Sequence, residues 1–143
     1  AVPEEFPQLV GRPLVVRGFV WFQGWNDMYD GDARVQYEDN LVHLIGDVRA
    51  EYNTPRLPVI IGELGNGGPE ASDKMLAIRA AQQAAAARPE LQGNVKFIST
   101  TAFARPKDES PNVGHGHHWF GNAESYFLIG DALGQGMVEL LQP

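Results

Sequence analysis

Three apolar stretches alternate along the chain with segments of helical periodicity. The first runs from Leu14 to Phe22 and is nearly continuous, with many β-branched and aromatic residues. This composition is typical of a buried strand in a parallel sheet. Leu57 to Leu64 (LPVIIGEL) predicts a second strand, and Asn94 to Thr101 (NVKFISTT) predicts a third. Residues 1–13 contain three prolines and no clear period, so we expect an irregular lead-in.

Each predicted strand precedes a segment with the spacing of a helix. Asp32 or a neighbour can cap the first helix, and Asn53 and Pro55 end it. The second helix is rich in alanine, opens at Asp73 and stops before Pro89. Apolar residues recur at helical spacing in the first and last helices, at Leu41, Leu44, Ile45, Val48 and Tyr52, and at Tyr126, Ile129, Leu133, Met137 and Leu140.

The alternation of strands and helices predicts an α/β fold, in which helices cover both faces of a parallel sheet. Three strands make a thin sheet, and one edge of the first strand would be bare. A bare edge exposes unpaired backbone groups and is an aggregation hazard. This is a first indication that part of the domain is missing from the chain.

Composition narrows the classes of partner. The 143 residues carry a formal charge of −7, and the 11 basic residues are scattered, which argues against nucleic acid as a partner. No apolar run has the length of a membrane span, so we expect no membrane partner. The chain has no cysteine, which excludes disulfides and thiolate metal sites. The compartment stays open, with a periplasmic or secreted location slightly favoured.

The first segment with candidate chemistry directly follows the first predicted strand. Ligands of open α/β sheets bind outside the carboxyl ends of the strands, where Gln23-Gly24-Trp25-Asn26-Asp27 falls. A glycine lets the backbone turn sharply and approach a ligand. Amide side chains donate hydrogen bonds without carrying charge, which suits a developing oxyanion. The alternative interpretation is a polar turn with an Asx cap.

The second such segment, Gly114 to Asn122, precedes the last helix and holds three of the four histidines. Histidine is the usual proton shuttle near neutral pH. Two alternatives are a solvated loop and a metal site in which His115 and His117 act with a carboxylate. No HExxH spacing and no second ligand cluster supports the metal site. His43 lies near the apolar stripe of the first helix and is expected to be structural.

These segments together resemble the SGNH hydrolase superfamily, in its sialate O-acetylesterase-like and carbohydrate esterase family six branch. Phe19 to Asp27 (FVWFQGWND) is similar to that branch's W-x-Q-G-x-x-D pattern and contains the wider G-x-N-D block. His118 to Glu124, followed by Tyr126 and by Ile129 to Gly134, is similar to the final block, where the catalytic histidine opens the last helix. The resemblance covers the chain from about residue 14.

The resemblance implies a flavodoxin-like three-layer αβα sandwich and a carbohydrate acetylesterase, a serine hydrolase that removes O-acetyl groups from sugars. The substrate would be an acetylated carbohydrate, and neither a metal nor an organic cofactor is needed. Trp21, inside a strand, is expected in the core. The site residues that the resemblance implies are His118 as general base, Gln23, Gly24 and Asn26 around the oxyanion, and Trp25 and Trp119 as substrate-binding residues.

The sequence departs from the family pattern in its nucleophile. The opening block, with a serine in a G-[DQ]-S context, is absent, and Ser72, Ser99, Ser110 and Ser125 lack that context. We therefore expect residues 14–143 to be the C-terminal half of a single domain, with only its last three strands and their helices. Its partner would be the missing N-terminal half or a second chain, and the chain alone would be inactive.

A second departure concerns the acid that orients the histidine. The family's D-x-x-H has His115 where aspartate is expected. A backbone carbonyl, Asp108 or Glu109 can take that place. Among the oxyanion donors the pattern favours Gln23 over Asn26 and leaves Asp27 structural. Two other functions stay open: a non-catalytic carbohydrate-binding or structural relative, and a metal-dependent hydrolase that uses the histidine cluster.

Overall fold

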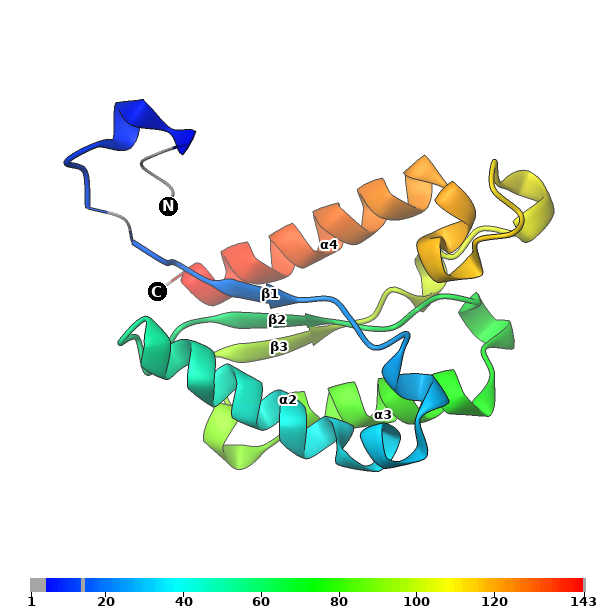
Figure 1. Cartoon of the computed structure of the whole chain (residues 1–143), viewed down its shortest axis with the longest axis horizontal. Coiled ribbons are helices and arrows are strands. Elements are labelled where there is room, and N and C mark those ends of the chain that lie inside the picture. Colours follow the sequence, from blue (N-terminus) through cyan, green and yellow to red (C-terminus); the bar gives the residue numbers. More distant parts are fainter. Residues whose placement is uncertain (1–4, 14, 143) are drawn as a thin grey trace.

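The computed structural model describes residues 5–13 and 15–142, and at its centre lies a sheet of three short strands (Figure 1). They are β1 (Phe19–Trp21), β2 (Val59–Gly62) and β3 (Val95–Ile98). All three are parallel and lie in the order β1-β2-β3, with Val59 opposite both Phe19 and Val95. The α/β class and the parallel sheet predicted from the sequence are confirmed.

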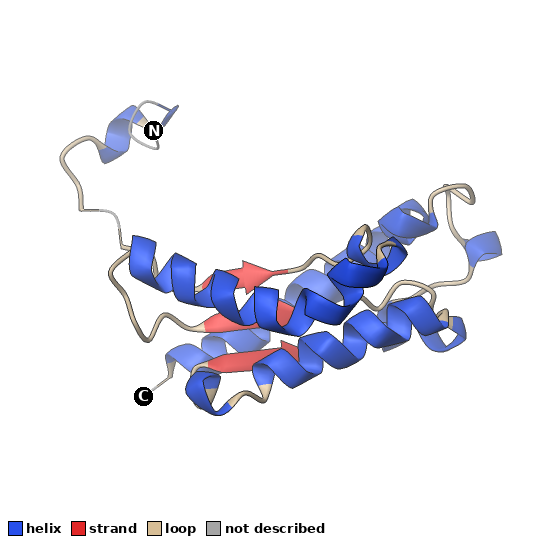
Figure 2. Ribbon diagram, turned by 60° about the horizontal axis from the view of Figure 1, so that its bottom comes forward, coloured by secondary structure: helices blue, strands red, loops and turns tan. Residues whose placement is uncertain are grey.

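Three long helices cover the sheet on both faces. They are α2 (Gly31–Glu51), α3 (Asp73–Ala86) and α4 (Ala123–Leu141). The first two lie side by side on one face, and α4 lies on the other, over β2 and β3 (Figures 1 and 2). The arrangement is consistent with part of an αβα sandwich.

The core lies on both sides of β2, the central strand. Val59 and Ile61 point into the layer of α2 and α3, whereas Ile60 points towards α4. All three are fully buried, because successive residues of a strand face opposite sides and both sides are covered. Each such side chain contributes roughly 1.5–3 kcal/mol through burial of its apolar surface.

The first strand is shorter and less buried than the sequence predicts. The expectation ran from Leu14 to Phe22, but β1 has three residues, and Leu14 lies outside the described residues. Val20 is 46% exposed and Phe22 is 36% exposed. Both lie on the side of α4, which packs over β2 and β3 and leaves β1 at a bare edge of the described sheet.

Polar side chains cap the helices close to the predicted starts. Asp30, a neighbour of Asp32, accepts a hydrogen bond from the Ala33 amide and begins α2, and Ser72 caps α3. Two members of the predicted apolar stripes are exposed instead of buried. Tyr52 stands at the C-cap of α2, and Tyr126 lies in the first turn of α4, where the helix extends past the sheet.

The lead-in contributes no buried residue to the described structure. Within residues 5–13 it forms one short turn, Pro7–Leu9, and it extends away from the three layers (Figure 1). Residues 1–4 of the predicted lead-in lie outside the described part. Among the described residues no helix is both long enough and apolar enough to cross a membrane.

The open edge of β1 predicts that the isolated chain self-associates. Unpaired backbone groups beside the exposed Val20 side chain can accept a further strand. Sedimentation velocity should show association that grows with concentration and that Val20→Lys reduces. Val35→Lys, at a position 84% exposed on α2, is the control and should leave association unchanged. A stable monomer for the unchanged chain at all concentrations would contradict this expectation.

Candidate active site

The turn after β1 forms one wall of a cavity at the carboxyl end of the sheet. Gly24 is buried in this turn and has a φ of 152°. A Cβ atom at this position would lie 2.8 Å from Cγ2 of Ile78, closer than real side chains pack. The turn therefore requires glycine, because the backbone angle is unfavourable for other residues and the neighbouring space is filled.

The histidine segment forms the opposite wall. The short helical segment Gly116–Gly121 is kinked, and Trp119 and Phe120 both have a φ of 52°. Bulky residues rarely adopt this conformation, and such strain gathers at functional sites. The kink buries Trp119 against α4 while His117 and His118 stay exposed. His118 thus lies before α4, which Asn122 caps, and does not open the helix itself.

The two walls enclose a cavity of about 320 Å³, the size of a small-ligand site. Segments far apart in the sequence meet there, as the positions of the strand ends predict. All six site residues expected from the sequence lie at this cavity. Its lining consists of Phe22, Gln23, Gly24, Trp25, Asn26, Leu64, Asn66, His117, His118 and Trp119.

The two candidate amide donors differ in how they are held. Nε2 of Gln23 donates a hydrogen bond to Oδ2 of Asp27 at 2.5 Å, which fixes the side chain. The interaction agrees with a structural role for Asp27. The Asn26 side chain is exposed and makes no hydrogen bond to another described residue. Gln23 is therefore the more ordered donor, and Asn26 is the freer one.

Asn66, from the glycine-rich loop after β2, is a cavity residue that the sequence did not single out. Its side chain is 3% exposed. Nδ2 of Asn66 donates to the carbonyls of Gly116 at 3.1 Å and of His117 at 3.4 Å. This amide therefore links the loop after β2 to the histidine segment. The only sequence signal was its place in a glycine-rich loop after a predicted strand.

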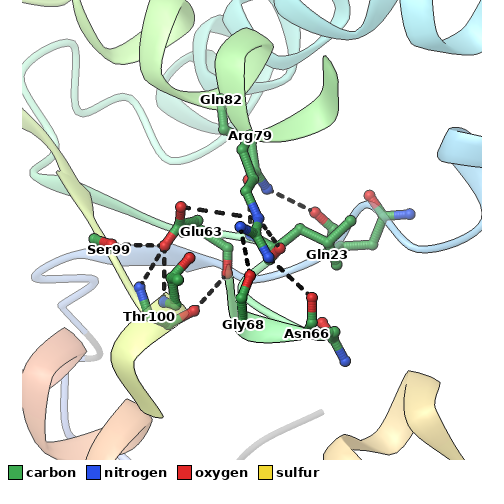
Figure 3. A network of polar contacts seen from close by, with 10 residues as sticks. Gln23, Glu63, Asn66, Gly68, Arg79, Gln82, Ser99 and Thr100 are labelled. Carbon is green, nitrogen blue, oxygen red and sulfur yellow. Dashed lines mark hydrogen bonds and ion pairs between the residues drawn. The ribbon is translucent and has the colours of Figure 1, made fainter. Parts of the chain in front are cut away.

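A buried polar network joins the segments that follow β2 and β3 to α3 (Figure 3). Arg79 of α3 donates to three backbone carbonyls of the loop after β2, at 2.7–3.2 Å. Oε2 of Glu63, at the end of β2, accepts from the Ser99 hydroxyl and from the Thr100 amide, both at 2.7 Å. The network ties the ends of β2 and β3 to α3. The three carbonyls that accept from Arg79 belong to Leu64, Asn66 and Gly68.

The charges of this network are mutually compensated. Burial opposes ionisation of Glu63, but the hydrogen bonds from Ser99, Thr101 and Thr100 outweigh it and lower the pKa of Glu63. Burial lowers the pKa of Arg79, and the Glu63 carboxylate partly offsets this effect. Nε of Arg79 lies 3.9 Å from Oε1 of Glu63. Both side chains are therefore charged at neutral pH and hold the strand ends in place.

The three histidines lie against one another beside Trp25. The ring centroids of His117 and His118 are 4.3 Å apart, and His115 lies 5.3 Å from His117. Desolvation, followed by the neighbouring His118 and His115, lowers the pKa of His117. The lowered pKa leaves His117 neutral at neutral pH.

His118 is held through its backbone. The Tyr126 hydroxyl donates to the His118 carbonyl at 3.0 Å, which fixes the segment to α4. Within the described part of the chain, neither Asp108 nor Glu109 forms a hydrogen bond to the His118 ring. Asp108 instead lines a different cavity, beside Phe120. The ring of His118 faces the site with neither candidate carboxylate bound to it.

The two tryptophans expected to bind substrate occupy different environments. Trp25 is half-buried at the cavity, with its ring 6.1 Å from Tyr29 and 5.7 Å from His117. Trp119 is 6% exposed and its ring stacks on Phe22 at 6.3 Å. Trp25 therefore offers a surface to a ligand, whereas Trp119 mainly supports the cavity wall. Trp21 packs against the core cluster of α2 and α3, as expected.

The metal alternative receives no support from the arrangement of the side chains. Among residues 5–13 and 15–142, no group of three or more histidine, aspartate, glutamate or cysteine side chains is placed to hold an ion. The cavity presents two histidines, three amide side chains and backbone amides, which are groups for proton transfer and for hydrogen bonding to an oxyanion.

Comparison with known protein families gives one match that spans nearly the whole chain. A family model described as carbohydrate esterase, sialic acid-specific acetylesterase matches residues 6–138. The match includes both cavity walls. Comparisons with curated proteins and with solved structures found no match.

Proposed function

We propose that O-acetyl groups are removed from a carbohydrate at the cavity of this chain, which belongs to the carbohydrate esterase family of sialic acid-specific acetylesterases. One observation carries the proposal. His118 lines the same cavity as the turn from Gln23 to Asn26, although the two segments come from opposite ends of the chain. A base and oxyanion donors around one small cavity are the arrangement that acyl transfer requires.

In the proposed reaction His118 moves the proton. A serine Oγ attacks the acetyl carbonyl carbon, and its proton passes to a ring nitrogen of His118. As the bond between the acetyl carbon and the sugar oxygen breaks, the imidazolium returns the proton to that oxygen. Water then attacks the acyl carbon and gives a proton to His118. The bond from that carbon to the serine Oγ breaks, His118 returns the proton to this oxygen, and acetate leaves.

The turn after β1 stabilises the oxyanion of the tetrahedral intermediate. Gln23 is the favoured side-chain donor, because Asp27 holds one hydrogen of its amide and leaves the other free to donate. Asn26 is the alternative donor, and the Gly24 backbone amide contributes from the same turn. Uncharged donors fixed before reaction lower the barrier without reorganisation.

The nucleophilic serine is proposed to come from outside these residues, from an N-terminal segment of the domain or a second chain beside β1. The four serines of the chain support this proposal, because none lines the cavity. Their side chains have other roles. Ser72 caps α3, Ser99 donates to Glu63, Ser110 donates to the Pro106 carbonyl, and Ser125 donates to the Phe103 carbonyl.

His118→Ala should abolish turnover when the chain is combined with the serine-bearing segment. Loss of a general base costs roughly 100- to 10,000-fold. His117→Ala is the matched control and should keep most of the activity, because His117 lies beside the proposed base but does not accept the serine proton. Release of acetate from an acetylated sugar measures both. The reverse ranking of the two variants would contradict the assignment of the base.

Gln23→Ala and Asn26→Ala distinguish the two side-chain donors in the same assay. Removal of one oxyanion donor typically lowers kcat by roughly 100- to 1000-fold with little change in KM. We expect the larger loss for Gln23→Ala. A loss of less than about tenfold for both variants would show that this turn is not the oxyanion site.

A further inference from the structure

The carbonyl of Gln23 is held by two side chains from different helices. The Tyr37 hydroxyl of α2 donates to this oxygen at 2.6 Å, and Nε2 of Gln82 of α3 donates to it at 3.0 Å (Figure 3 shows the contact of Gln82). A carbonyl oxygen has two lone pairs, so these two donors saturate it. The oxygen is therefore directed into the layer of α2 and α3.

Both donors are themselves fixed in orientation. Oε1 of Gln82 accepts from the Leu64 amide at 2.9 Å, which leaves its nitrogen to face Gln23. The Tyr37 oxygen accepts from Nε1 of Trp21 at 3.2 Å, so its single hydrogen is free for the Gln23 carbonyl. Burial raises the pKa of Tyr37, which keeps that hydrogen in place. Gln82 is fully buried and Tyr37 is 5% exposed, so water does not compete.

The anchored carbonyl determines the direction of the next amide. In a trans peptide the C=O and the following N–H point in opposite directions, and the described chain has no cis peptide bond. The Gly24 N–H therefore points away from α2 and α3. It has no hydrogen-bond acceptor among the described residues, although Gly24 is buried and lines the cavity. Buried backbone amides without a partner are rare.

We propose that Tyr37 and Gln82 are positioning residues, which hold the Gln23–Gly24 peptide so that the Gly24 N–H donates to the oxyanion. Neither side chain lines the cavity, so both act through the peptide that they hold. The inference rests on the proposed function of the cavity. It adds which side chains fix the direction of the Gly24 amide.

Tyr37→Phe removes one anchor and retains the buried ring. In the ¹⁵N-labelled chain, sodium acetate, the product anion, should shift the Gly24 amide proton downfield, with sodium chloride as the ionic control. Tyr37→Phe should reduce that shift. Tyr52→Phe, in an exposed tyrosine at the far end of α2, should leave it unchanged. Val20→Lys provides a monomeric background if the chain associates.

With the serine-bearing segment present, Tyr37→Phe should lower kcat about tenfold and leave KM nearly unchanged, a smaller loss than deletion of a donor. If Tyr37→Phe fails to fold, Gln82→Met removes the other anchor and should reduce the acetate-induced shift of the Gly24 amide proton in its place. An unresponsive Gly24 amide in the unchanged chain, or a shift in both anchor variants as large as in the unchanged chain, would overturn the proposal. The acetate titration needs no turnover, so absence of esterase activity would contradict the proposed function alone.

Discussion

Arg79 reaches from α3 to the carboxyl end of the sheet, where its guanidinium binds the carbonyls of Leu64, Asn66 and Gly68. These carbonyls lie in the buried segment that leads from β2 to the short helix Gly68–Glu70, outside the strands of the sheet. Each would cost roughly 1–3 kcal/mol if left without a donor. Asn66 in turn holds the histidine segment. Both the loop after β2 and the opposite wall of the cavity therefore depend on the Arg79 side chain.

The strand ends are joined by side chains as well as by the sheet. Gln82 connects the ends of β1 and β2, and Glu63 connects the ends of β2 and β3. Neither of these two side chains, which belong to the layer of α3 and the sheet, lines the cavity itself. Fixed donors around a site stabilise a developing charge without rearrangement, so the rigidity of this layer is what the proposed chemistry requires.

The pattern of apolar residues predicted the order of strands and helices, because burial imposes a period on each element. It overestimated the first strand, since apolar composition does not reveal that Val20 is half exposed in the described part of the chain. The site segments were predictable from the strand end and the clustered histidines. Tyr37 and Gln82 were not, because their roles depend on one carbonyl that lies 14 and 59 positions away in the chain.

In the proposed esterase these residues supply the base and the oxyanion donors, and the nucleophile comes from a segment outside them. A fluorophosphonate probe tests it directly, because the probe reacts with activated serines in acyl-transfer sites. The isolated chain, analysed by peptide mass spectrometry, should carry no label on its four serines. After combination with a serine-bearing segment, the label should appear on that segment. Labelling of Ser72, Ser99, Ser110 or Ser125 in the isolated chain would contradict the account.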